Sequence, residues 1–311
     1  MNKIPLFLSL IIISLLVLSC DKEVSVDNTA KTRGVEIIVV NYPLFYFTQY
    51  LVEDLAKVTF PVPDNIDPAD WKPQLQDILK LQQADLIVLN SSGYSNWLDK
   101  VSLSSSKLLD SSRSITSELI PFTKQTTHSH GPQGDHSHSA YAFTLWMDPE
   151  LAKKQVFVIS QALAKRWPQH KQAIQLRETE LIEQLTNLDT EYQEQASRLK
   201  NTKIIYSHPV YQYFERRYHL NGQSLHWEPN VMPSEKQWNQ LKIMLNRIKL
   251  TEKNSLFIWE DFPTPEIAQR LSLMGVNFVV IRPAANSSSN DWLTEQQSNL
   301  KRLKVCCDAE K

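Results

Sequence analysis

The chain has 311 residues, enough for two domains of ordinary size, and its 42% hydrophobic and 22% charged residues allow a packed core. The 33 Lys and Arg residues balance 34 Asp and Glu residues, so no broad phosphate-binding surface and no nucleic-acid partner is expected. Only 6 glycines are present, and the sequence contains neither the glycine-rich nucleotide-binding motifs nor the GxSxG motif of hydrolases.

Residues 1–19 have the layout of a lipoprotein signal peptide. Lys3 is followed by an almost wholly apolar stretch up to Leu18, and then by Ser19 and Cys20. The sequence VLSC resembles the bacterial lipobox, which implies that Cys20 is lipidated and anchors the chain to a membrane. We therefore expect a lipoprotein on the periplasmic face of the inner membrane, or on the cell surface of a Gram-positive organism, with a flexible tether over residues 20–34.

Strands and helices alternate through the next part of the chain. Residues 35–40 form a β-rich apolar run typical of a buried parallel strand, and residues 84–90 form a second one. Helical patterns cover residues 43–56 and 74–83. This alternation predicts an N-terminal α/β lobe with a mostly parallel sheet over residues 35–168.

A long helix is predicted to link this lobe to the rest of the chain. Asp148 and Pro149 are typical of a helix start, and that helix should end before Pro168. Residues 169–200 contain no glycine and no proline, and their apolar positions follow one helical stripe. The members of this stripe are Ile174, Leu181, Leu185, Leu188, Tyr192 and Leu199.

A second α/β lobe is predicted over residues 201–311. Its expected strands are residues 203–206, 255–260 and 277–282, and its expected helices are residues 210–219, one beginning at Ser234, one beginning at Pro265, and residues 291–303. The predicted fold class is thus α/β, with two lobes of mostly parallel sheets joined by one long helix. Because ligands bind beyond the carboxyl ends of parallel strands, we expect a cleft between the lobes, near Tyr42, Asn90, His208, Glu260 and Arg282.

A histidine-rich segment interrupts the pattern at residues 126–140, where we predict a loop. His128 and His130 form one His-x-His pair, and His136 and His138 form another. Neutral imidazoles are good ligands for zinc, and also for copper or nickel. The alternative is an unstructured polar loop that binds nothing.

His208 and two cysteines are further candidates. His208 follows a predicted buried strand and precedes Pro209, which is a site position, although such a histidine can also serve only as a turn residue. Cys306 and Cys307 are adjacent, so no disulfide framework is expected. We predict free thiols, with soft metal ligation near the C-terminus as the alternative.

Several segments together resemble the zinc and manganese solute-binding lipoproteins that feed ABC importers. The resemblance covers roughly residues 35–303. It implies a two-lobed protein that binds a metal ion, with Zn²⁺ favoured over Mn²⁺ or another divalent ion as its identity, and delivers it to the importer's permease. We expect a monomer. The segments are NYPLFYFTQYL, IDPADWKPQLQDILKLQQADLIVLN, GYSNWLD, LWMDPELAKK and SHPVYQYFERRYHL.

The resemblance also implies four ligand positions, two in each lobe. These correspond to Ala69, Thr144, His208 and Arg282, of which only His208 is an ordinary zinc ligand. Either the histidine loop folds over the cleft beside His208, or nearby side chains substitute as ligands. The nearby candidates are Asp67, Asp70, His226, Glu228, Glu260 and Asp261.

The favoured hypothesis is an extracytoplasmic, lipid-anchored zinc-binding component of an importer. One alternative is a membrane-anchored metal buffer or sensor with no transport partner. Another is an importer component for an anionic or chelated ligand, which Arg282, Arg216 and Arg217 would favour. An enzyme is not expected, because the sequence offers no nucleophile and base in a recognisable arrangement.

Overall fold

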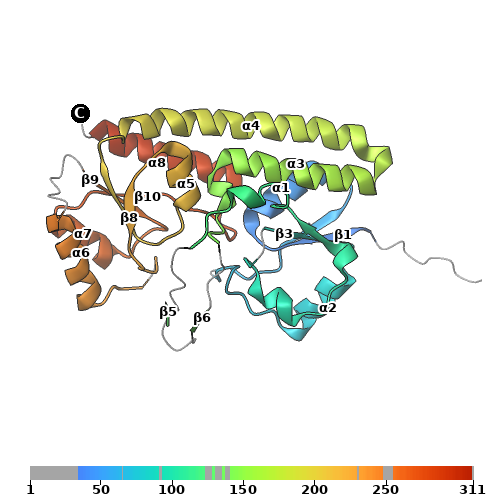
Figure 1. The fold of residues 1–311 in the computed structure, drawn as a ribbon, viewed down its shortest axis with the longest axis horizontal. Coiled ribbons are helices and arrows are strands. Elements are labelled where there is room, and N and C mark those ends of the chain that lie inside the picture. The colour runs from blue at the N-terminus through green and yellow to red at the C-terminus, as the bar shows by residue number, and fades with distance from the viewer. Residues whose placement is uncertain are drawn as a thin grey trace, which may run out of the picture. The chain divides into compact units, whose positions relative to one another are not determined.

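The computed structural model describes residues 34–64, 66–90, 93–122, 128–129, 135–136, 141–229, 231–247 and 255–309. Residues 34–311 form one compact unit. Two four-stranded parallel sheets with surrounding helices build it, so the predicted α/β class is confirmed (Figure 1). Across these described ranges, no helix is both long and apolar enough to cross a membrane.

The first sheet has the strand order β2-β1-β3-β4 and is parallel throughout. Its strands are β1 (Glu36–Val39), β2 (Lys57–Thr59), β3 (Leu86–Leu89) and β4 (Leu108–Asp110). The inner strands β1 and β3 were predicted from their apolar runs. The edge strands β2 and β4 were not, because each has only three residues and one buried side chain.

Capping side chains open two helices of this half, and the one at Asp148 was predicted. Asn41 accepts a hydrogen bond from the backbone of Leu44 and opens α1 (Tyr42–Val52), and Asp148 caps α3 (Pro149–Arg166) in the same way. Helix α1 ends earlier than predicted, because Glu53 adopts φ 49° and turns the chain toward β2. The remaining elements are α2 (Leu75–Gln83) and the short 3₁₀ helices Asn96–Lys100, Ser105–Lys107, Thr116–Glu118, Leu145–Met147 and Pro168–His170.

The second sheet has the order β10-β9-β7-β8, again parallel. Its strands are β7 (Lys203–Tyr206), β8 (Gly222–Ser224), β9 (Ser255–Trp259) and β10 (Phe278–Val280). Three of them match predicted strands, and the edge strand β8 was missed because it is short and polar. The helices are α5 (Gln212–Tyr218), α6 (Glu235–Arg247), α7 (Pro265–Leu273) and α8 (Trp292–Ala309).

Helix α4 (Lys171–Arg198) is the predicted long helix, and its 28 residues are unbroken. All six side chains of the predicted apolar stripe are buried. This buried face contacts α1 and α3 from the first half of the chain and α5 and α8 from the second. Figure 1 shows α4 running alongside α3 and α8.

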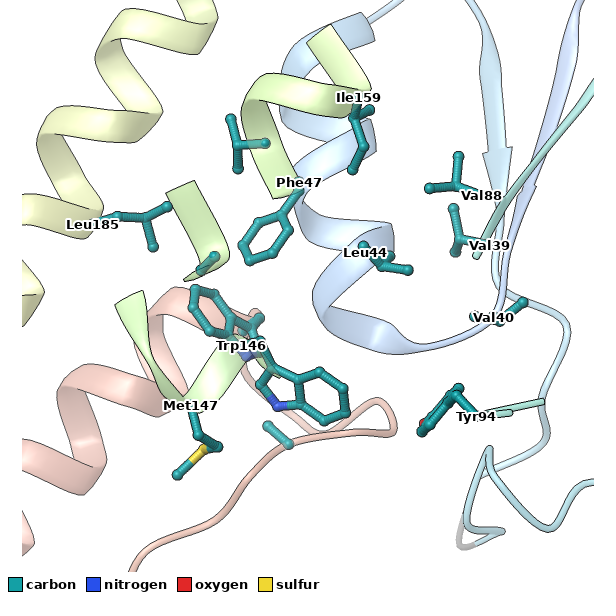
Figure 2. Close-up of a cluster of buried hydrophobic side chains, with 14 of the residues drawn as sticks. Val39, Val40, Leu44, Phe47, Val88, Tyr94, Trp146, Met147, Ile159 and Leu185 are labelled. Atoms are coloured by element: carbon teal, nitrogen blue, oxygen red, sulfur yellow. The ribbon is translucent and has the colours of Figure 1, made fainter. Parts of the chain in front are cut away.

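A continuous hydrophobic core also joins the two halves. Figure 2 shows side chains of β1, α1, α3 and α4 gathered around Phe47 and Trp146, both of which are fully buried. The indole nitrogen of Trp146 donates a hydrogen bond to the carbonyl of Pro283, 2.8 Å away, in the segment that follows β10. Trp146 thus connects the first sheet's core directly to the loop beyond the second sheet.

A buried ion pair fixes α5 against α4. Asp189 of α4 is 4% exposed and accepts hydrogen bonds from the guanidinium of Arg217, including one of 2.9 Å from its Nε. The hydroxyl of Tyr218 donates to the same carboxylate at 3.1 Å. Arg217 also lies near Asp148 and Glu150 at the start of α3, so one guanidinium bridges three helices.

Gly222 at the start of β8 leaves no room for a side chain. A Cβ atom there would lie 2.3 Å from the ring of Tyr206 and 3.0 Å from the carbonyl of Ile204. We expect Gly222→Ala to lower the free energy of unfolding by about 1–3 kcal/mol, since overpacking forces neighbouring groups apart. Urea unfolding measures this loss in the free energy of unfolding. Gly34→Ala is the control, because its Cβ meets nothing within 4 Å and stability should stay unchanged.

Candidate metal site

A cavity of about 330 Å³ lies at the carboxyl ends of three strands of the second sheet. His208 follows the end of β7 by two residues, Glu260 follows β9 directly, and Arg282 follows β10 by two residues. Parallel strands bring their carboxyl ends to one edge, which is why residues far apart in sequence meet here. The other walls come from residues 66–68 of the first half, from Glu228, Pro229 and Val231, and from the segment 282–287.

The imidazole of His208 lies between two carboxylates. Its Nδ1 atom is 2.9 Å from Oε2 of Glu260, and its Nε2 atom is 4.0 Å from Oε1 of Glu228. Both Nδ1 and the facing Oε2 are buried, and neither makes a hydrogen bond of acceptable geometry with any residue that the structure describes. The backbone of Glu260 is held by the hydroxyl of Ser207, which accepts a 3.0 Å hydrogen bond from its N–H.

These carboxylates change the acidity of His208. Burial alone would lower the pKa of its imidazole, but the negative charges of Glu260, Glu228 and Asp67 outweigh burial and raise this pKa to about 9. Without a bound cation, the imidazole is therefore protonated at neutral pH and forms an ion pair with Glu260.

Asp67 stands at the mouth of the cavity, with its side chain still reached by solvent. Its carboxylate accepts a 2.9 Å hydrogen bond from the backbone N–H of Ala69. Protein atoms crowded around the carboxyl, together with the charges of Asp70 and Glu260, raise the pKa of Asp67 to about 6. Asp67 therefore adds negative charge to the cavity at neutral pH.

Arg282 lines the cavity, but its charge is already compensated. Its guanidinium forms an ion pair with Asp261 at 2.9 Å and approaches Glu295 at 3.4 Å. Arg216 and Arg217 lie elsewhere, against the carbonyl of Glu118 and the carboxylates of α3 and α4. The expected grouping of these arginines around one anion is thus not found in this arrangement.

Four of the other expected cleft residues do not line the cavity. Thr144 is buried, and its hydroxyl donates a 2.5 Å hydrogen bond to the carbonyl of Val210. Asn90 is also fully buried and donates to the carbonyl of Phe143 at 2.7 Å. Neither of them lines this cavity, and the same holds for Tyr42 and Asp70 within the described part of the chain. Other contacts thus hold Asn90 in the first half's core, whereas the backbone N–H of Tyr42 donates to the carbonyl of Ala285, which lines the cavity. A cleft shared by Tyr42, Asn90 and His208 stays a prediction.

The histidine-rich segment is described at four positions only. β5 (His128–Ser129) pairs antiparallel with β6 (Asp135–His136), and the register sets His128 opposite His136. The predicted loop over 126–140 thus includes a short strand pair. His130 and His138 lie outside the described residues, as does Cys20.

Two further findings complete the metal-ligand candidates. Neither Cys306 nor Cys307 forms a disulfide with another described residue, and Cys307 is buried in α8. In the ranges that the structure describes, no group of three or more His, Cys, Asp or Glu side chains is arranged to hold a metal ion. Asn286 and Ser287, which also line the cavity, were not predicted; their position after a predicted strand end was the only signal.

The sequence matches known proteins along most of its length. A profile of the family "zinc-uptake complex component A, periplasmic" matches residues 37–306. The high-affinity zinc uptake system protein ZnuA of Bacillus subtilis is 29% identical over 66% of this chain and 66% of its own length. The zinc-binding lipoprotein AdcA of Streptococcus pneumoniae is 24% identical over 100% of this chain and 62% of its own length. The chain thus spans less than two thirds of the length of these relatives.

Solved structures have the same fold. The metal-dependent lipoprotein YcdH of Bacillus subtilis superposes with a TM-score of 0.72 at 23% identity, covering 88% of this chain and 99% of that one. The Zn(II)-bound ZnuA-like domain of Streptococcus pneumoniae AdcA gives a TM-score of 0.71 at 22% identity, with 88% and 99% coverage. The fold is therefore that of the two-lobed solute-binding proteins. The chain belongs to the zinc-uptake component A family, as the sequence resemblance indicated.

Proposed function

We propose that this protein captures zinc outside the cytoplasm and delivers it to an ABC importer. The zinc ion is the cargo, and the protein binds and releases it without a chemical reaction. Family membership supports the substrate class, because the matching profile describes a component of zinc uptake. The chemistry of the cavity supports it independently.

The observation that carries the proposal is the pair of buried donor atoms on His208 and Glu260. Imidazole nitrogen and carboxylate oxygen are ordinary zinc ligands at about 2.0–2.2 Å, and in a tetrahedral site two such ligand atoms lie roughly 3.4 Å apart. Nδ1 of His208 and Oε2 of Glu260 are 2.9 Å apart, so a small outward shift of either side chain would let both bind one ion. Glu228, near the other ring nitrogen, would orient the imidazole, as carboxylates behind a metal-bound histidine do.

The charge in the cavity also favours a cation. Asp67, Glu228 and Glu260 contribute three carboxylates, while Arg282 is already paired with Asp261. A divalent cation that replaced the proton on His208 would balance most of this negative charge. An anionic ligand would meet repulsion there, which counts against the alternative of an anion importer.

Two protein donors do not complete a zinc site, and we propose that the histidine-rich segment supplies the others. Residues directly opposite in an antiparallel pair lie on the same face of the ladder, so the register of His128 and His136 supports a shared role for them. His130 and His138 belong to the same proposal by sequence. Lipidation of Cys20 would keep the protein at the membrane beside the permease.

Zinc titration of the protein from residue 20 onward tests this proposal. Four forms are compared by calorimetry at neutral pH: wild type, His208→Ala, a deletion of residues 128–138, and both changes combined. We expect tight binding by the wild type, at least 100-fold weaker binding by His208→Ala, and none by the combined form, because loss of a group that merely supports a metal ligand already costs about 10- to 100-fold in affinity.

Other outcomes separate the alternatives. No zinc binding by the wild type, or binding that survives both changes, would reject the proposal. Loss of all binding with the deletion alone, together with an unaffected His208→Ala variant, would indicate a metal buffer that uses only the loop.

A further inference from the structure

A pair of side chains beyond β10 clips the two halves together at the mouth of the cavity. The amide nitrogen of Asn286 donates hydrogen bonds to two carbonyls of the first half, those of Pro63 at 2.8 Å and Ile66 at 2.7 Å. The hydroxyl of Ser287 donates to the carboxylate of Asp64 at 2.7 Å. We call these contacts the Asn286 clip. One Asn side chain thus uses both of its amide hydrogens on a single turn.

The segment that carries the clip has a rigid base. Ala284 adopts φ 56°, a left-handed conformation that is uncommon for a residue with a side chain and persists only where its surroundings enforce it. On either side, the carbonyl of Pro283 accepts from Trp146, and the carbonyl of Ala285 accepts from the backbone of Tyr42 at 2.9 Å. Asn286 is therefore presented from a fixed position.

The clip acts on the residue next to a cavity carboxylate. Ile66 immediately precedes Asp67, so a hydrogen bond to the Ile66 carbonyl fixes the peptide that leads into Asp67. Asp67 in turn interacts electrostatically with His208 and Glu260. If Ile66 moved outward, the negative charge of Asp67 would leave the mouth of the cavity, and the cavity would open on that side.

We propose that Asn286 is a positioning residue for the zinc site, which holds Asp67 at the cavity mouth and thereby slows the release of the ion. This inference rests on the proposed function. Asn286 touches no ion itself; its effect passes through the turn before Asp67. Ser287 supports the same turn through Asp64.

Zinc dissociation into an excess of a chelator, followed by stopped-flow, tests the inference. Asn286→Leu keeps the side chain's approximate size and removes both donors, and we expect dissociation to become at least 10-fold faster. Ser287→Ala, which removes one hydrogen bond, should give a smaller increase. Ser289→Ala is the matched control, because this exposed serine lies in the same segment and does not line the cavity; its rate should equal that of the wild type.

A double-mutant cycle distinguishes positioning from general loosening. In an Asp67→Ala background, Asn286→Leu should have little further effect on the zinc dissociation rate, since the carboxylate that it positions is gone. The same fold-increase in both backgrounds, or an unchanged rate in the single variant, would overturn the inference.

Hydrogen exchange of residues 66–71 in the metal-free protein reports on the clip without zinc. We expect faster exchange there in Asn286→Leu, with an unchanged unfolding midpoint; unchanged exchange would overturn the inference. If the wild type itself bound no zinc, the proposed function would fail and this inference with it. Zinc binding by the wild type with an unaffected clip variant rejects the clip alone.

Discussion

Zinc affinity is expected to rise at least about 100-fold between pH 6.5 and pH 8.5. The Glu260, Glu228 and Asp67 carboxylates raise the pKa of His208 to about 9, so the ion must displace a proton throughout this range. Displacing one proton makes the apparent affinity increase about tenfold per pH unit below that pKa. Competition with a chelator of known zinc affinity, at three pH values, measures this slope.

Affinities measured between pH 7.5 and 8.5 distinguish binding by His208 from binding by the histidine-rich segment alone. An imidazole with an ordinary pKa of about 6.5 is almost fully deprotonated above pH 7.5, so a site made only of such histidines stops gaining affinity there. We expect the wild type to gain about tenfold from pH 7.5 to 8.5, and His208→Ala to level off. A plateau in the wild type above pH 7.5 would show that His208 does not bind the ion.

The stability of the metal-free protein should fall as pH rises, whereas the zinc affinity increases. The pKa of His208 is higher in the folded state than in the unfolded chain, so its stabilising contribution is full below about pH 6.5 and is lost as pH rises through 9. The pKa of Asp67 is raised to about 6, so its contribution falls earlier, as pH rises from about 4 through 6. Bound zinc should reverse the trend that His208 causes, because the ion takes the place of the proton on its imidazole.

Arg217→Met is expected to destabilise the fold by about 3–5 kcal/mol. The substitution leaves Asp189, 4% exposed in α4, with a buried charge and no cation to compensate it. The hydroxyl of Tyr218 still donates to this carboxylate but carries no charge. Urea unfolding of the metal-free protein measures the loss.

The double variant Asp189→Leu/Arg217→Met tests the reason for that loss. Removing both charges removes the unpaired buried carboxylate, so at least half of the lost stability should return. Glu235→Gln is the surface control: its partner Arg270 forms an exposed pair, and the change should leave the unfolding midpoint nearly unchanged. A loss below 1 kcal/mol in Arg217→Met would contradict the importance of this ion pair.

The sequence predicted the long and buried elements well. The stripe in α4 and the apolar runs of β1, β3, β7 and β9 carry periodic or continuous hydrophobic signals, which local sequence can reveal. The edge strands β2, β4 and β8 have three residues each, and their pairing depends on neighbours that are distant along the chain. Such strands have no local signal strong enough to identify them.

The site was predictable only where strand ends define it. His208, Glu260 and Arg282 each follow a recognisable strand, so their meeting at one sheet edge could be expected. The sequence gives no sign that Arg282 pairs with Asp261 or that the hydroxyl of Thr144 is used in a buried hydrogen bond. Both contacts depend on side-chain geometry across the fold. Asn286 was missed for a similar reason: its partners are backbone carbonyls more than two hundred residues away.

The unbroken length of α4 has a consequence for how cargo enters and leaves. A helix of 28 residues is about 42 Å long, and this one contacts helices of both halves along its course. A wide hinge motion that bent α4 would break its backbone hydrogen bonds or expose its apolar stripe to water. Gating should therefore involve local displacements of side chains and short turns, and the radius of gyration measured by X-ray scattering should hardly differ between loaded and empty protein.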